Sequence, residues 1–524
     1  MEVMEIGLFD PGMTPLHRAG LAGLYMTLSA FDSAGSTITG LDWELKRRKL
    51  ILHWDEDERR PAFEQLVENA FRIDQEGFFD FPALQRNVAQ DRSQKRHLHC
   101  VLLNTFFQHG QHRTLGEAED FSYEIDGKVR WISNFQPVQE LDCHQRFINK
   151  LSNQKSGEWA DQQIRVAGWL YPGAGQRHHR FTSTKLQEPL WRSLCLLFAP
   201  IGCLYYRIRI PDSDVNRKYR VALIIPRVSD LKSYAQLRES GAQVHVDEKV
   251  AAGSSDAGLR FVFLLDQQTR TDQMAHAVNS ERPCGVATFG SVQWNKNQKS
   301  RTHLFTPQSS LLDRRNGRYN YWTAYRCFPN ERLRETDPDT GREYVQVRPS
   351  AARGLVADNV ASGKPWYSGF ADMMSQEQFR NKLFYERRGL HDMVEQSHFD
   401  QERERIFVKA CHQAWRSRMA QLYERAKKEN IASEPLINRE RERFRVALTR
   451  CKNADTLRET VTDFWARAGT ISELGEHWPE MLPLLNEDNW RKARDLAMLA
   501  LASYPSETET ESSNSRPEQE GVER

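Results

Sequence analysis

"FDPGMTPLHRAGLAGLYMTL", residues 9–28, is the stretch on which the interpretation of the N-terminal fold depends. It carries three glycines, a feature that phosphate-binding loops share. Gly20 and Gly23, however, lie three residues apart inside an apolar helical run from about Pro15 to Ala30. That spacing puts both on one helix face, where a missing side chain lets another backbone approach. Pro15 suits a first helical turn. We therefore predict a closely packed helix and no nucleotide site.

Other candidate phosphate motifs along the chain are incomplete. A P-loop needs spaced glycines before a Lys-Ser/Thr pair, and "ASGKPW" (361–366) follows its Gly-Lys with proline. The dinucleotide fingerprint fails in "GAGQRH" (173–178), where His178 replaces the third glycine. No nucleotide cofactor is expected.

Length and composition bound the protein class. A chain of 524 residues is long enough for two or three domains, and its charged content of 27% leaves 39% hydrophobic residues for a core. The eight cysteines form no CxxC pair, which argues against a zinc ribbon and a disulfide framework. No secretion signal and no bilayer-length apolar run is evident. We expect a cytoplasmic protein without a membrane contact.

Residues 1–365 mix strand-like and helix-like patterns. The runs 219–226, 259–266 and 319–328 are short and rich in β-branched or aromatic residues, and we predict strands there. Residues 228–240 have helical spacing, with Ser229 as the N-cap. The mixture predicts an α+β body with basic loops.

The composition changes near residue 365. From Met374 on strand signals disappear, and Ser375 and Gln378 have the spacing of a capping box. We predict an all-helical bundle of four or five helices within 366–504. The tail 505–524 has six Glu, two Arg and almost no apolar residue, so it is expected to be disordered.

No catalytic pattern stands out. HExxH and GxSxG are absent, and His391-Asp392 lies on a charged helix where a solvated face is the plainer interpretation. The histidine clusters in 97–100 and 177–180 lack a second cluster at zinc spacing. We expect no catalytic residue, no metal and no cofactor.

Three basic loops indicate nucleic-acid binding. Amide side chains pair with adenine edges, whereas Lys and Arg contact guanine or phosphate. Basic side chains beside aromatic ones suit single-stranded nucleic acid. For each loop alone, a solvated charge run is at least as good an interpretation. The candidate residues in 294–305, 314–326 and 173–181 are Asn295, Lys296, Asn297, Lys299, Arg301, Arg314, Arg315, Arg318, Gln176, Arg177 and His178.

A fourth candidate surface lies in the helical region. Arg405, Lys409, His412 and Arg416 follow one another at helical spacing and form a basic stripe. Such a stripe is suited to phosphate neutralisation.

Three blocks carry a family resemblance: the opening stretch, "GWLYPGAGQRHHRF" (168–181) and "YRVALIIPRVSDLKSYAQL" (219–237). Their order, with a helical C-terminus, resembles the large subunit of a type I CRISPR surveillance complex (Cascade) of the I-B-like or Myxan subtype. The resemblance covers most of the chain and names no catalytic residue.

The resemblance implies a non-catalytic subunit near the 5′ handle of the guide CRISPR RNA. Such a subunit recognises the protospacer-adjacent motif (PAM) in duplex DNA and supports R-loop formation, while guide pairing reads the target. It implies these partners: Cascade backbone and handle-binding subunits, helical small subunits, and a helicase-nuclease or a transposition adaptor. The C-terminal bundle resembles the small subunit.

Start codons coincide with the predicted boundary. Met373 and Met374 precede the bundle, and Met393 follows. We hypothesise that internal translation there yields free copies of the bundle as extra small subunits.

Two alternatives stay open. One is a metal-dependent nuclease that acts on DNA or RNA with a site assembled from dispersed Asp, Glu and His. The other is a helical scaffold whose basic loops only keep it soluble. The sequence also leaves antiviral defence and RNA-guided transposition undecided.

Overall fold

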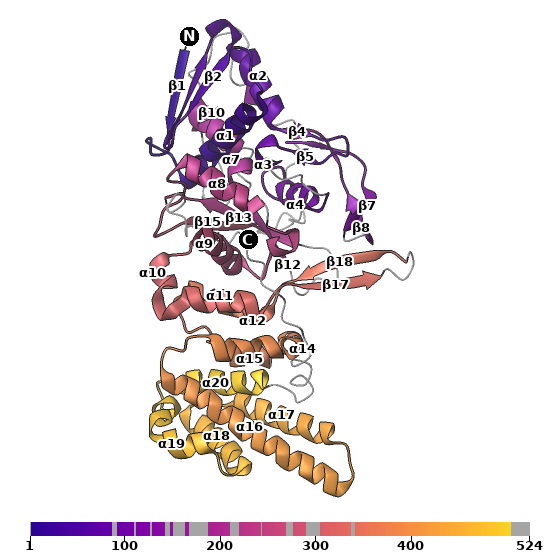
Figure 1. Cartoon of the computed structure of the whole chain (residues 1–524), viewed down its shortest axis with the longest axis vertical. Helices are drawn as coiled ribbons and strands as arrows, with labels where there is room; N and C mark the ends of the chain where they lie inside the picture. Colours follow the sequence, from indigo (N-terminus) through magenta and orange to yellow (C-terminus); the bar gives the residue numbers. More distant parts are fainter. Residues whose placement is uncertain are drawn as a thin grey trace. The chain divides into compact units, whose positions relative to one another are not determined.

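The computed structural model of the chain divides into two compact units (Figure 1). Unit 1 comprises Met1–Ser309 and Asn330–Pro349, and unit 2 comprises Ser310–Pro329 and Ser350–Arg524. No helix in the part that the structure describes is long and apolar enough to cross a membrane. The described residues are 2–85, 92–108, 112–125, 128–141, 147–149, 163–166, 187–209, 219–242, 244–268, 276–289, 304–336 and 341–504.

Unit 1 begins with a three-stranded antiparallel sheet in the order β1-β3-β2, formed by β1 (Glu2–Gly7), β2 (Leu41–Leu45) and β3 (Lys49–Trp54). Between β1 and β2 the chain forms α1 (Pro15–Ala34). Thr14 caps α1, and Pro15 occupies the first helical position. The predicted helix is therefore confirmed.

The predicted close packing of α1 is also confirmed. A Cβ atom on Gly20 would overlap the carbonyl oxygen of Cys195, and one on Gly23 would overlap that of Phe198. Both carbonyls belong to α7 (Leu190–Gly202), whose Gly202 approaches the carbonyl of Ala19 in return. Glycine on both helices brings the two backbones together, so this glycine-rich stretch serves packing.

A five-stranded sheet forms the centre of unit 1, in the order β14-β12-β13-β15-β16. The predicted strand 219–226 is β13 (Tyr219–Pro226), which pairs with antiparallel neighbours on both sides. α1 and α9 pack against β13, and its apolar run Val221–Ile224 is fully buried. The other members are β12 (Leu204–Arg209), β14 (Val250–Ala251), β15 (Cys284–Phe289) and β16 (Leu304–Phe305), with α8 (Leu231–Ala242) and α9 (Ser254–Gln268) between them.

Short elements complete unit 1. They are η1 (Glu56–Glu58), α2 (Arg59–Ala70), β4 (Arg72–Ile73), β5 (Phe79–Asp80), α3 (Pro82–Gln85), α4 (Arg92–Leu103), β6 (Thr114–Leu115), β7 (Glu119–Ile125), β8 (Lys128–Phe135), β9 (Val138–Glu140), β10 (Ile164–Arg165), β11 (Gln187–Glu188), η2 (Val246–Lys249), β17 (Glu331–Thr336) and β18 (Glu343–Arg348).

Two predicted strands are wrong. Residues 259–266 lie inside α9, where Ala257, Phe261, Leu264 and Leu265 turn one helical face inward. Residues 319–328 lie almost wholly in α11 (Gly317–Cys327) of unit 2. A short apolar run fits a buried helix as well as a strand, and here the helices extend beyond the runs that were considered.

The start of α8 also differs from the prediction. The carboxylate of Asp230 accepts a hydrogen bond from the backbone N–H of Ser233 at 2.8 Å. Ser229 instead donates its hydroxyl to the carbonyl of Arg227. Asp230 is therefore the residue that caps α8, because its carboxylate reaches the first free N–H groups.

Unit 2 is helical from Phe370 to Ser503, and no strand follows β18 in the described residues. The α+β region followed by an all-helical bundle is thus confirmed, but the predicted four or five helices are too few. The bundle helices are α13 (Phe370–Ser375), α14 (Glu377–Tyr385), α15 (Arg387–Gln396), α16 (Glu402–Glu429), α17 (Ser433–Arg450), α18 (Ala454–Ala468), α19 (Ser472–Met481) with η5 (Leu482–Leu485), and α20 (Trp490–Ser503). Unit 2 also contains α10 (Ser309–Leu312), η4 (Arg314–Asn316), α11 and α12 (Ala351–Ala361).

The bundle core forms between long helices. α16 packs against α17, α18, α19 and α20 (Figure 1). The rings of Trp415, Phe444 and Phe464 stack, with centroids 4.0 Å apart for the two phenylalanines. The predicted capping box at Ser375 is wrong: Ser375 ends α13, and Gln376 precedes α14 without a side-chain cap.

Candidate nucleic-acid interface

The residues predicted to contact bases lie outside the described part of the chain. They are Asn295, Lys296, Asn297, Lys299 and Arg301 in one loop, and Gln176, Arg177 and His178 in another. The strands flanking the first loop, β15 and β16, pair antiparallel at Val286↔Phe305. The acidic tail also lies outside the described residues.

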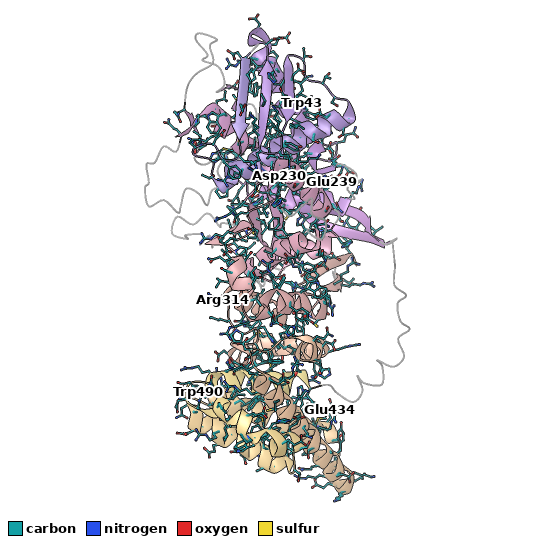
Figure 2. The ribbon with its side chains drawn as sticks, turned by 60° about the vertical axis from the view of Figure 1, so that its left-hand side comes forward. Trp43, Asp230, Glu239, Arg314, Glu434 and Trp490 are labelled. Atoms are coloured by element: carbon teal, nitrogen blue, oxygen red, sulfur yellow. The ribbon has the colours of Figure 1, made fainter. Side chains whose placement is uncertain are left out.

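The arginines predicted at 314–318 form a tight turn in unit 2. Arg315 has a left-handed φ of 52° and pairs with the carboxylate of Asp400. Arg318 lies 2.6 Å from the carboxylate of Asp313. Arg314 is exposed on the same turn (Figure 2). Acidic partners therefore offset two of these three cations.

In the predicted basic stripe on α16, two side chains contact other parts of unit 2 and two are exposed. Arg405 donates to the carbonyl of Ser397 and covers the Phe399 ring. His412 lies 2.9 Å from the hydroxyl of Ser503, and burial lowers its pKa to about 4, so it is neutral at physiological pH. Lys409 and Arg416 are exposed and are the two members placed to meet phosphate.

A further basic surface was not predicted from the sequence. Lys46, Arg47, Arg48 and Lys49 form the turn between β2 and β3 and line a pocket of about 850 Å³ in unit 1. We call this the turn pocket. Its other lining residues are Glu5, Gly7, Leu8, Phe9, Asp10, Ser229, Asp230, His276, Val278, Asn279 and Ser280.

Contacts from behind fix the turn. The N–H of Leu231 donates to the carbonyl of Arg47 at 2.7 Å, and the guanidinium of Arg47 lies 2.6 Å from the carboxylate of Asp230. Lys49 pairs with Glu5 at 2.7 Å. Arg48 is exposed between these two anchored residues. Arg48 therefore projects outward from a turn that its neighbours' contacts hold in place.

An aromatic ring lies beside these cations. Phe9 is 55% exposed, and the guanidinium of Arg18 lies 4.8 Å from its ring centroid. Burial, with Arg227 nearby, lowers the pKa of Arg18. Asp10 accepts a hydrogen bond from the N–H of Gly7 at 2.7 Å and holds the Phe9 loop. An exposed ring next to guanidinium groups is the arrangement on which a nucleobase stacks beside its phosphate.

The sequence did carry a signal for this pocket. Four consecutive basic residues stand between two short apolar strands at 46–49. The predicted loops combine basic residues with amide, aromatic or glycine residues, whereas here a two-residue β-turn concentrates the charge without them.

The histidines of "HLHC" are structural. The Nε2 of His99 lies 2.9 Å from the carbonyl of Gln136, and its ring contacts Phe78 and Phe135. Burial lowers the pKa of His99 to about 4, and it lowers the pKa of His97 as well. Among the described residues, no group of three or more His, Cys, Asp or Glu is placed to hold a metal ion.

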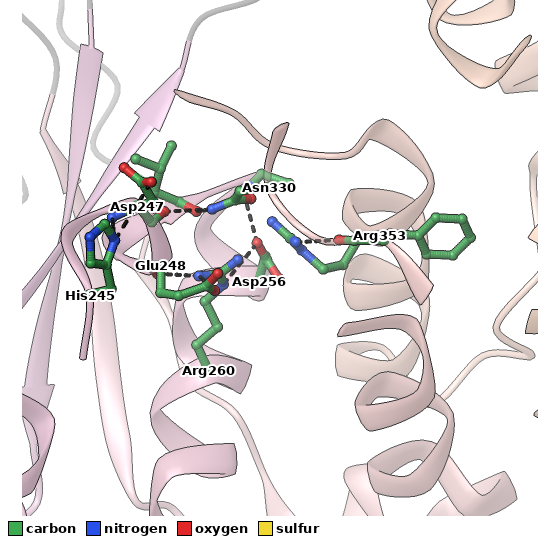
Figure 3. Close-up of polar contacts among 10 residues, drawn as sticks. His245, Asp247, Glu248, Asp256, Arg260, Asn330 and Arg353 are labelled. Atoms are coloured by element: carbon green, nitrogen blue, oxygen red, sulfur yellow. Dashed lines mark hydrogen bonds and ion pairs between the residues drawn. The ribbon is translucent and has the colours of Figure 1, made fainter. Parts of the chain in front are cut away.

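Two carboxylates outside these surfaces, the buried Asp256 and the partly exposed Glu248, have structural partners. In unit 1, Asp256 and Glu248 each lie 3.4 Å from the guanidinium of Arg260 (Figure 3). Asn330 donates to the carbonyls of Asp247 and Val250, which ties β17 to the chain before α9 (Figure 3). These groups hold elements together, since arginine and amide donors occupy the acceptors.

Two protein-family models match separate parts of the chain. The DevT N-terminal domain matches residues 5–197, which include the turn 46–49, α1 and the first part of α7. The DevT C-terminal domain matches residues 395–524, which include α16 to α20.

A relative matches nearly the whole chain. "CRISPR-associated protein Cas8a1/Csx13" of Myxococcus xanthus (strain DK1622) is 28% identical over 530 residues, which covers 96% of this chain and 88% of that protein. Both DevT domains are matched in order and the similarity to this CRISPR-associated protein extends over nearly the whole chain, which supports its recognition as a large subunit of a type I CRISPR system.

Proposed function

We propose that the chain is the non-catalytic large subunit of an RNA-guided Cascade complex, which recognises the protospacer-adjacent motif in duplex DNA and supports R-loop formation. In such complexes guide pairing reads the target, while the protein contacts the motif and the backbone. The turn pocket is the observation that carries this proposal, because it places a fixed cation beside an exposed ring.

Backbone and base contacts are assigned to different residues. The turn pocket, Lys409 and Arg416 supply phosphate contacts, which position nucleic acid without reading its sequence. The loop with Asn295, Lys296, Asn297, Lys299 and Arg301 reads the motif, with Gln176, Arg177 and His178 as second candidates. Amide and guanidinium groups are the side chains that pair with base edges.

The proposal assigns no bond-breaking step to this chain. Purified protein with Mg²⁺ or Mn²⁺ and end-labelled DNA tests this directly. Cleavage that a single carboxylate substitution abolishes would establish the metal-dependent nuclease instead.

The partners follow from the assignment. They are guide CRISPR RNA, target duplex DNA, the backbone and handle-binding subunits, and a helicase-nuclease or a transposition adaptor. Helical small subunits complete the complex, and internal translation at Met373, Met374 or Met393 supplies copies of the bundle. The protein works in the cytoplasm, in antiviral defence or in guided transposition, and the neighbouring genes distinguish these two.

Alanine substitutions in the loop 295–301 test motif reading. Losing one bidentate base contact costs roughly 1–3 kcal/mol and relaxes one motif position. The measurement is the affinity of the RNA-loaded complex for a panel of duplexes that differ only in the motif. Variants that discriminate among the panel as the wild type does would remove this loop from the assignment.

A further inference from the structure

A small pocket lies wholly within unit 1, where α1, α3 and α8 contribute its walls. Its volume is about 220 Å³. Pockets for drug-sized ligands are larger, at roughly 300–1,000 Å³, so this one suits a single functional group on a short stem. We call it the α8 pocket, because α8 supplies its charged side chains. The lining residues that matter most are Tyr25, Met26, Leu84, Lys232, Arg238 and Glu239.

Arg238 lines this pocket as a buried arginine that has no partner. Only 8% of the residue is exposed, and its Nε has no hydrogen-bond partner. Among the residues that the structure describes, its guanidinium group forms no ion pair and donates no hydrogen bond. Arginine is almost never buried unless it is paired, because an unpaired guanidinium has lost its hydration without compensation. An acceptor for Arg238 therefore has to come from a ligand in the pocket.

The other buried arginines show what Arg238 lacks. In unit 1 the guanidinium of Arg260 lies 3.4 Å from the carboxylate of Asp256. In unit 2 the guanidinium of Arg353 donates to the carbonyl of Phe328. Among the buried arginines in the described part of the chain, Arg238 is the exception.

The ionisable groups around Arg238 do not balance its charge. Burial raises the pKa values of Cys203, Tyr205 and Tyr234, and the positive charge of Arg238 offsets this only in part. Burial also lowers the pKa of His97. All four groups are therefore neutral at physiological pH, whereas the guanidinium stays protonated. The missing countercharge has to be an anion.

The other lining residues favour a singly charged anion on an apolar stem. Lys232 adds a second cation and Glu239 a carboxylate, which leaves one net positive charge among the described lining residues. A phosphate monoester carries up to two negative charges, so Glu239 repels it more strongly than a carboxylate. Tyr25, Met26 and Leu84 are buried in the wall, where they can contact CH₂ groups. A guanidinium binds a carboxylate through two parallel N–H···O bonds.

We propose that the α8 pocket is a carboxylate-binding site. Arg238 and Lys232 bind one carboxylate on a short aliphatic stem, and side chains of α1 and α3 contact the stem. An acidic side chain of another protein and a free aliphatic monocarboxylate both carry this group. Neither guide RNA nor DNA takes part, so the test is independent of the proposed function.

Methionine-methyl NMR of the full-length chain tests the site. Met26 lines the pocket, so its resonance, assigned with Met26→Leu, reports occupancy there, and the resonance of Met481 in unit 2 should not shift. The probes are N-acetylglutamate N-methylamide for a protein side chain, butyrate for the free acid, and N-acetylglutamine N-methylamide as the neutral control. We expect both acids to shift the Met26 resonance saturably, and the tighter of the two identifies the source. The glutamine probe should bind at least about tenfold more weakly, because it lacks the charge-assisted hydrogen bonds.

Arg238→Gln should weaken binding of both acids at least about tenfold. The matched control is Arg60→Gln on α2, where Arg60 pairs with Glu64 outside the pocket, and it should keep the affinity. Without ligand, the melting temperature of Arg238→Gln should stay within about 4 °C of the wild type or rise, because the substitution removes an unpaired buried charge.

A larger fall in melting temperature would overturn the proposal, because it would show that Arg238 already has a structural partner. Equal affinity for the glutamate and glutamine probes, unchanged binding in Arg238→Gln, or an unshifted Met26 resonance would overturn it as well. Inorganic phosphate that binds more tightly than either acid would show a phosphate site instead.

Discussion

Gly20 shows how much a single residue decides in this fold. The sequence predicted that Gly20 and Gly23 admit a second backbone, and the carbonyl groups of α7 stand where their Cβ atoms would be. The identity of that second helix was not predictable, because α1 and α7 are separated by more than 150 residues of chain and no local pattern links them.

Gly20→Ala should destabilise unit 1 by about 3 kcal/mol, since the added methyl group overlaps backbone and forces the helices apart. Urea unfolding measures this. Gly285→Ala is the control, because nothing lies within 4 Å of a Cβ there and the chain around it is a strand. A Gly20→Ala protein as stable as the Gly285→Ala protein would contradict the packing described.

Asp495 gives unit 2 a pH dependence. Its carboxylate accepts hydrogen bonds from the N–H groups of Gly369 and Ala371, yet burial raises its pKa from 3.8 to about 6. A carboxyl group with a raised folded pKa favours the folded state below about pH 4, and that contribution is lost as the pH rises to about 6. The loss is about 3 kcal/mol.

The substitution Asp495→Asn isolates this effect, because the amide does not titrate. Relative to the wild type, the variant should gain about 3 kcal/mol in unfolding free energy between pH 4 and pH 7. Denaturant unfolding at both pH values measures the difference. A constant difference would show that Asp495 titrates normally.

Arg48 tests the turn pocket. Arg48→Gln should weaken binding to all sequences alike and lower the slope of log affinity against log salt by about one, as the loss of one phosphate contact does. Arg60→Gln on α2, where Arg60 pairs with Glu64, is the control. A change in sequence preference, or no change in salt slope, would remove Arg48 from the phosphate contacts.

At the scale of elements, the sequence distinguished strand from helix correctly where polar residues or proline mark both ends of an apolar run. β13 is bounded by polar residues and proline, and its strand was predicted correctly. α9 begins at Ser254, five residues before the apolar run 259–266 that was predicted as a strand. The prediction did not include this preceding polar turn. In α11 the aromatic residues favoured a strand. The structure instead forms a helix in which Asn320 and Tyr321 are buried and Asn320 donates to the carbonyl of His398.

The internal-start hypothesis belongs to this scale. Met373 and Met374 lie inside α13, after Gly369 and Ala371, so a product that starts there lacks both backbone donors to Asp495. The bundle of such a product should therefore be less stable than that of the full chain.

Replacing Met373 and Met374 by Leu should abolish any product that starts at these codons. The exchange conserves volume, so these buried positions should tolerate it at a cost below about 1.5 kcal/mol. Mass spectrometry of the purified complex reads the result, with Met393→Leu as the comparison for the later start. A short product unchanged by all three substitutions would disprove internal initiation at these codons.

At the scale of the molecule, the order of an α+β region and a helical bundle was legible from composition, and the DevT domains match both ends of the chain. The turn pocket was less predictable, because it joins residues from 5 to 280. Such sites depend on tertiary packing, whereas the basic run at 46–49 was visible in the sequence.

The most direct measurement is the affinity of the RNA-loaded complex, purified with its genomic neighbours, for two duplexes that share the guide-matched target and differ only in the adjacent motif. We expect a small RNA to copurify and one duplex to bind at least tenfold more tightly, a difference of about 1.4 kcal/mol in binding free energy. Equal affinity for the two duplexes, or purification free of RNA, would contradict it.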